Sequence, residues 1–159
     1  MNTLVLYDSQ YGNTERIAQA IAATLDGFGE ARAVLVDQTN PAEFNSLDLL
    51  VVGSPTQGWR QTPAIQSFLE ETSSEALGSL AVALFDTRFR LPRFMTGSDA
   101  KVMAGKLREK GVLLFVAPES FFVKGTEGPL RDGELERAST WARMFAKEVK
   151  TSRPKARQQ

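Results

Sequence analysis

The chain of 159 residues contains neither cysteine nor histidine. Without cysteine it can form no disulfide, and it offers no thiol nucleophile, redox dithiol or cysteine-held iron–sulfur cluster. Without histidine it has no Ser-His-Asp triad and no imidazole metal site. Redox chemistry in this protein would therefore require a cofactor that other groups bind.

Long apolar runs are also absent. Every apolar stretch is far shorter than the roughly 20 residues that a membrane-spanning helix needs, so we expect no membrane span. Residues 1–7 have neither the basic segment nor the cleavage site of a secretory signal, and we expect a cytoplasmic protein.

Neither sign of charge is in excess, because 19 Lys and Arg balance 19 Asp and Glu. This balance argues against a nucleic-acid-binding surface. The last residues, 150–159, differ from the rest because they contain basic residues and no acidic one. We expect one domain at residues 1–149, followed by a basic, disordered tail at residues 150–159.

Five short apolar runs are continuous rather than alternating, which is typical of parallel strands with both faces buried. They lie at residues 4–7, 33–36, 49–52, 80–85 and 112–116, and the last run is interrupted and resumes after Pro118. Apolar stripes with helical spacing lie at residues 17–25, 65–69, 102–107 and 135–149. This alternation predicts a three-layer α/β/α fold, doubly wound around a five-stranded parallel sheet.

In such a sheet, ligands bind beyond the carboxyl ends of the strands. The first loop at this edge, residues 8–14, leads directly into a helix whose free N–H groups could hold a phosphate. Ser9 and Thr14 add hydroxyl groups, and Gly12 allows a left-handed backbone. The loop lacks the sequence patterns of nucleoside-triphosphate and dinucleotide loops. The alternative to a phosphate site is that this loop only caps the start of the helix.

Two further loops at this edge carry aromatic groups. In residues 53–63, Trp59 could stack on a flat ligand or lie half-buried on the surface. In residues 85–94, aromatic side chains are interspersed with arginines, which could enclose a ring or an anion, or simply be solvated. Together the three loops fit a mononucleotide with a large planar ring.

Residues 4–15 resemble the opening strand and the T/S-x-T-G-x-T phosphate loop of the flavodoxin-like family, and residues 51–56 resemble its second flavin loop. The resemblance covers about residues 1–149. It implies a sheet of order 2-1-3-4-5 and non-covalently bound FMN. The chain is similar to the short-chain flavodoxins, because it lacks the insertion that splits the last strand of the long-chain form.

By this resemblance, six residues of the first loop would hold the phosphate: Ser9, Gln10, Tyr11, Gly12, Asn13 and Thr14. The flavin ring would be bordered on one side by Pro55, Thr56, Gln57, Gly58 and Trp59, and on the other by Asp86, Thr87 and Arg88. There are departures from the family pattern. Tyr11 replaces the usual threonine, and Trp59 lies later than the usual aromatic residue. The third loop lacks the common tyrosine, so Phe89 or Arg88 would cover that face.

The resemblance implies an electron carrier that exchanges electrons with an unidentified redox partner protein, as a monomer or a weak dimer. An FMN-dependent NAD(P)H:quinone oxidoreductase or a porphyrinogen-oxidase-type flavoenzyme is one alternative, although the chain has little spare length for a substrate loop. A flavin-less interaction domain is another. A strongly acidic docking face is not evident, and the arginines of the third loop indicate a different kind of partner from a basic one.

Overall fold

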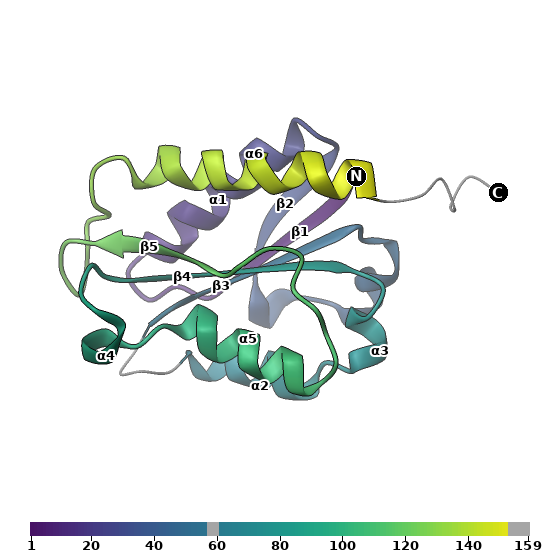
Figure 1. The fold of residues 1–159 in the computed structure, drawn as a ribbon, viewed down its shortest axis with the longest axis horizontal. Coiled ribbons are helices and arrows are strands. Elements are labelled where there is room, and N and C mark those ends of the chain that lie inside the picture. Colours follow the sequence, from purple (N-terminus) through teal and green to yellow (C-terminus); the bar gives the residue numbers. More distant parts are fainter. Residues whose placement is uncertain (57–60, 153–159) are drawn as a thin grey trace.

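The computed structural model describes residues 1–56 and 61–152. Its five strands form one parallel sheet in the order β2-β1-β3-β4-β5, with helices on both faces (Figure 1). The predicted class and strand order are confirmed. The strands are β1 (Asn2–Tyr7), β2 (Glu30–Leu35), β3 (Leu49–Pro55), β4 (Ala81–Phe89) and β5 (Glu119–Val123). The helices are α1 (Asn13–Asp26), α2 (Pro63–Glu71), α3 (Ser74–Leu77), α4 (Arg93–Thr96), α5 (Asp99–Glu109) and α6 (Glu134–Ser152), with 3-10 turns η1 (Val36–Gln38) and η2 (Pro41–Ser46).

The two faces of the sheet bury separate cores, because successive side chains of a strand point to opposite faces. Val51 and Phe85 pack under α1 and α6, whereas their neighbours Val52 and Leu84 pack against α2 and α5. All four side chains are fully buried. This burial on both sides explains why the strands appear in the sequence as continuous apolar runs.

The first two long helices begin close to the carboxyl edge of the sheet. The helix α1 follows Gly12, whose φ of 87° lies in the left-handed region that favours glycine, and it ends at Asp26, with Gly27 as its C-cap. The helix α2 begins at Pro63, and the Thr62 hydroxyl accepts a hydrogen bond from the Ile65 N–H at 3.4 Å. Each helix start therefore leaves N–H groups at the edge where a ligand would bind.

The fifth strand differs from the prediction. Residues 112–116 do not form the main strand; they make one bridge, between Leu114 and Val82. The ladder belongs instead to β5, which pairs with the second half of β4 at residues 85–89. Pro118 lies between the two segments and has no N–H to donate to a ladder, so the pairing cannot be continuous. The part of the run that resumes after Pro118 is thus the part that reaches the carboxyl edge.

The helix α6 closes one face of the sheet. Trp141 packs edge-on against Phe145, Phe85 and Phe121, with ring centroids 4.8–6.4 Å apart. The helix continues past the expected boundary at 149 and ends at Ser152. The remaining residues, 153–159, lie outside the described part of the chain. Within that part, no helix combines the length and apolar character that crossing a membrane requires.

Candidate functional site

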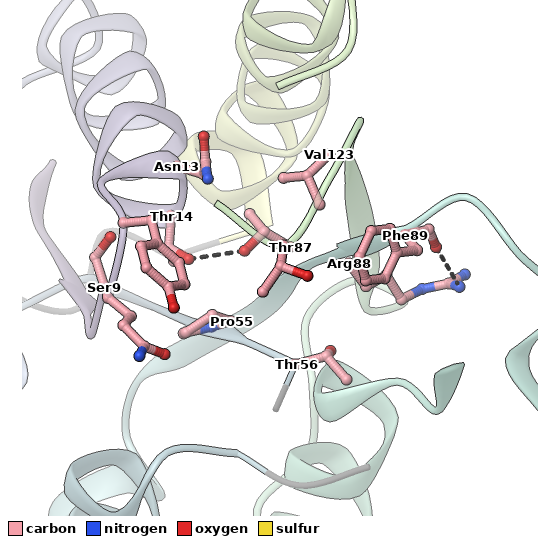
Figure 2. A pocket seen from close by; sticks show the side chains of 12 residues that line it. Ser9, Asn13, Thr14, Pro55, Thr56, Thr87, Arg88, Phe89 and Val123 are labelled. Atoms are coloured by element: carbon pink, nitrogen blue, oxygen red, sulfur yellow. Dashed lines mark hydrogen bonds between the residues drawn. The ribbon is translucent and has the colours of Figure 1, made fainter. Parts of the chain in front are cut away.

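A cavity of about 350 Å³ lies beyond the carboxyl ends of β1, β3 and β4 (Figure 2). Most of the expected site residues meet there. Its lining consists of Ser9, Gln10, Tyr11, Asn13, Thr14, Pro55, Thr56, Thr87, Arg88, Phe89, Val123 and Thr126. Gly12 does not line the cavity, but its backbone conformation turns the loop into α1. Gln57, Gly58 and Trp59, also expected at the site, lie outside the described residues.

The loop before α1 is organised around the Ser9 hydroxyl. Its oxygen accepts hydrogen bonds from the N–H groups of Gly12 at 3.0 Å and Glu15 at 3.4 Å. A serine hydroxyl has two lone pairs and one proton, so these contacts use both lone pairs and leave the O–H free to donate. The loop thus presents the Ser9 hydroxyl as a donor.

The first turn of α1 supplies further donors. Within residues 1–56 and 61–152, the N–H groups of Asn13 and Thr14 have no hydrogen-bond acceptor. These groups lie at the positive end of a helix of 14 residues, which favours a bound anion. Together with the Ser9 hydroxyl, they form a set of donors that have no acceptor among the described residues.

A pair of hydroxyl groups joins this loop to the end of β4. The Oγ1 atoms of Thr14 and Thr87 lie 2.8 Å apart, and both residues are buried (Figure 2). The Asn13 amide also donates to the Glu127 carbonyl at 3.2 Å. These two contacts therefore fix the first loop to β4 and to the segment after β5.

Apolar groups form the other walls of the cavity. Pro55 ends β3, Phe89 ends β4 and Val123 ends β5, and all three line the cavity (Figure 2). Val123 and Thr126 were not expected at the site, because only the loops after the first, third and fourth strands were assigned to it. The signal that could have found them is the run that resumes after Pro118, because its end lies at the same edge of the sheet.

Arg88 lines the cavity, but its guanidinium is already bound. Its Nε donates to the Ser120 hydroxyl at 3.0 Å, and one terminal nitrogen donates to the carbonyls of Phe89 at 3.3 Å and Leu91 at 3.0 Å. The residue is buried, and the guanidinium carbon lies 5.2 Å from the ring centroid of Phe122. Arg88 therefore holds the third loop in place rather than presenting a free charge to the cavity.

Asp86, which was expected beside the flavin ring, does not line the cavity. Alternation along β4 sends Thr87 and Phe89 to the cavity side and Asp86 to the α5 side. There Asp86 is fully buried, and its Oδ2 accepts from the Ser98 hydroxyl at 2.7 Å and the Ala100 N–H at 3.0 Å. Burial raises the pKa of Asp86.

A second buried carboxylate, Asp99, lies close to Asp86 at the start of α5. Burial, and next the charge of Asp86, raise the pKa of Asp99 to about 8. The Ser54 hydroxyl donates to its Oδ2 at 3.3 Å, and its own N–H donates to the Thr56 hydroxyl oxygen at 3.4 Å. Because Thr56 lines the cavity, this carboxylate pair lies directly behind the site. The sequence analysis did not single out Asp99, because the residue lies outside the three loops assigned to the site.

The residues present are suited to a flavin mononucleotide. Cavities that hold ligands of this size measure roughly 300–1,000 Å³ and combine apolar walls with a few polar groups. Here a set of unshared donors lies at one end and apolar side chains lie at the other. The described lining contains no carboxylate, which would repel a phosphate.

Comparison with known families identifies the domain. A family model described as a flavodoxin domain matches residues 4–110. The chain belongs to the flavodoxin family. FMN is the cofactor of this family. No curated protein matches the chain.

Solved structures agree with this family in fold. A flavodoxin from the domain Archaea has 21% identity and a TM-score of 0.74, over 94% of this chain and 99% of its own. Flavodoxin 2 from Bacillus cereus has 25% identity and a TM-score of 0.72, over 93% and 99%. Rubredoxin oxygen:oxidoreductase from Desulfovibrio gigas has 20% identity and a TM-score of 0.73 over 94% of this chain, but only 36% of its own length is matched.

Proposed function

We propose that this flavodoxin-family protein binds FMN in the cavity and carries electrons to or from a protein partner. The observation that carries the proposal is the first loop. The Ser9 hydroxyl and the N–H groups of Asn13 and Thr14 form an anion site in which no side chain charge is needed. The Ser9 hydroxyl and these two N–H groups would hold the phosphate.

The apolar ends of β3, β4 and β5 would border the isoalloxazine ring. Pro55, Phe89 and Val123 would exclude water from one region of the cavity, and Thr56 and Thr87 would add hydroxyl groups beside it. When bound, FMN supplies the redox chemistry, and the protein supplies binding, orientation and electrostatics.

The described lining holds few groups that could transfer a proton, which favours a carrier over an enzyme. It contains no carboxylate, and the chain has no histidine or cysteine, so the Tyr11 phenol is the one usual general acid or base in that lining. An electron carrier needs no such group. Steady-state oxidation of NAD(P)H with a quinone acceptor by the purified protein would instead favour the oxidoreductase alternative.

The binding experiment is a titration of apoprotein with FMN and with riboflavin, which lacks the phosphate, followed by flavin fluorescence. We expect Ser9→Ala to weaken FMN binding about 10- to 100-fold, because a hydrogen bond to a charged group is worth about 1.5–3 kcal/mol. Riboflavin binding should change far less. Ser67→Ala, at an exposed position of α2, is the matched control.

Two results would contradict the proposal. A wild-type protein that leaves the fluorescence of FMN unchanged would favour the flavin-less interaction domain. An equal loss of FMN and riboflavin affinity in Ser9→Ala would show that Ser9 does not contact the phosphate.

A further inference from the structure

Large apolar side chains are exposed along the segment that leaves the cavity at the end of β4. After β4, the chain leaves Phe94 78% exposed and Met95 55% exposed, and Leu91 is about half-exposed. Phe89 at the end of β4 and Tyr11 of the first loop are also partly exposed, and both line the cavity. Single exposed apolar residues are common, but a cluster of them usually marks a contact surface. We call Phe89, Leu91, Phe94 and Met95 the apolar rim.

The loop that carries this rim also borders a second, charged cleft. The cleft measures about 440 Å³ and is lined by Arg90, Phe122, Lys124, Arg131, Asp132, Glu134 and Arg137. Arg90 lies between Phe89 and Leu91 of the rim, so the cleft and the rim share this segment of the chain. In Figure 1, α4 and the end of β5 lie at the same end of the molecule.

Two cations of the cleft remain available for a partner. Arg137 pairs with Glu134 at 2.7 Å and Glu119 at 3.2 Å, and Lys124 pairs with Asp132 at 3.4 Å. Arg90 and Arg131, by contrast, have no ion pair with any residue of the described chain. Arg90 is exposed, and its guanidinium carbon lies 6.0 Å from the ring centroid of Phe122. The usable charge of the cleft is therefore positive.

We infer that the apolar rim and this cleft together form the docking surface for an acidic redox protein. The inference rests on the proposed electron-carrier function and adds the chemistry of the partner. Such interfaces combine an apolar centre with a polar rim, and complementary charges orient the partners and accelerate their encounter. The partner would place apolar side chains on the rim, next to the cavity, and carboxylates against Arg90 and Arg131.

Nuclear magnetic resonance can map this surface on the ¹⁵N-labelled protein. The probe is a gallium-substituted plant-type ferredoxin, an acidic and diamagnetic protein, and reduced cytochrome c serves as its basic counterpart. With the ferredoxin at low salt, we expect shifts of the amides of residues 89–95 and 122–131. Added salt should weaken this binding, because the surface charges are screened. Cytochrome c should leave these amides unchanged.

Charge-reversal variants test the two arginines. The double variant Arg90→Glu with Arg131→Glu should bind the ferredoxin about tenfold more weakly, since each exposed charge pair contributes modestly. The control Lys147→Glu makes the same kind of charge change at an exposed position of α6 and should stay within about twofold of the wild type.

Substitution of the apolar rim tests its centre. Phe94→Ser should weaken binding at every salt concentration, whereas Met144→Ser, at an exposed position of α6, should not. Both positions are exposed, so neither variant removes core packing.

Three results would overturn the inference. Cytochrome c could bind more tightly than the ferredoxin, or the ferredoxin could shift only amides outside residues 89–95 and 122–131. The third is an equal loss of ferredoxin affinity in the variants and their controls. The visible spectrum of the same samples reports FMN separately. A protein that fails to bind FMN but shows the expected ferredoxin map would refute the carrier function and support the acidic-partner surface.

Discussion

The buried carboxylate of Asp99 makes a specific prediction for stability. Its side chain is fully buried, its Oδ1 has no hydrogen-bond partner in the described structure, and Asp86 lies nearby. Burial is the main reason that its pKa rises from 3.8 to about 8. Asp99→Asn replaces this titrating group with an amide of similar size that has no charge at any pH.

The sign follows from proton binding in the two states. Between the unfolded pKa near 4 and the folded pKa near 8, the folded protein binds more protons at Asp99 than the unfolded chain does. Stability from this group is therefore complete at low pH and is lost as the pH rises toward 8. One pKa unit corresponds to 1.36 kcal/mol, so a rise of two pH units, from pH 6 to pH 8, should cost at most about 3 kcal/mol.

The assay is urea unfolding of the wild type and Asp99→Asn between pH 6 and pH 8.5. We expect the free energy of unfolding of the wild type to fall over this range, and that of Asp99→Asn to fall much less. Asp132→Asn is the control, because the Asp132 side chain is almost fully exposed. A wild type whose stability is constant or rises with pH, or a variant with the same slope, would refute the reasoning.

Two other predictions concern the packing beneath the cavity. A Cβ at Gly53 would lie 2.0 Å from Cζ of Phe85, whose ring is held between Phe121 and Trp141, so Gly53→Ala should lower the free energy of unfolding by about 1–3 kcal/mol. Urea unfolding measures this, and the added substitution Phe85→Leu should recover part of the loss; no recovery would place the strain elsewhere. Arg88→Gln removes the branched guanidinium whose hydrogen bonds to Ser120 and Leu91 fix the third loop. It should weaken FMN binding several-fold in a fluorescence titration, with a changed flavin spectrum. Arg88→Lys should restore little of it, because lysine lacks the fork, and unchanged FMN affinity in Arg88→Gln would contradict the positioning role.

Most of the fold was accessible from the sequence because each central strand is buried on both faces. The runs at residues 4–7 and 49–52 could be recognised without knowledge of their neighbours, and β1 and β3 were found there. The loop at residues 8–14 could also be predicted from the sequence, because it directly joins a recognisable strand to a recognisable helix. Its residues Ser9, Asn13 and Thr14 do line the cavity.

The fifth strand could not be assigned from its composition. Residues 112–116 are more apolar than β5, yet Leu113 is 81% exposed and β5 pairs with β4. What decides between the two segments is which of them reaches the second half of β4, and that depends on the tertiary structure. The cavity contacts of Val123 and Thr126 follow from this choice.

In the third loop, neighbouring residues have different roles because the pleat of the strand sends their side chains to opposite faces of the sheet. The prediction ended the strand near residue 85 and treated residues 85–94 as one loop, but β4 continues to Phe89. Because side chains alternate, Thr87 and Phe89 shape the cavity, while Asp86 lies behind it. The guanidinium of Arg88, which lines the cavity, binds the Leu91 carbonyl and the Ser120 hydroxyl, so its role there is structural. Arg90 and Arg131, which form no ion pair within the described part of the chain, line the second cleft and not the cavity, so we expect them to act on a partner and not on the cofactor.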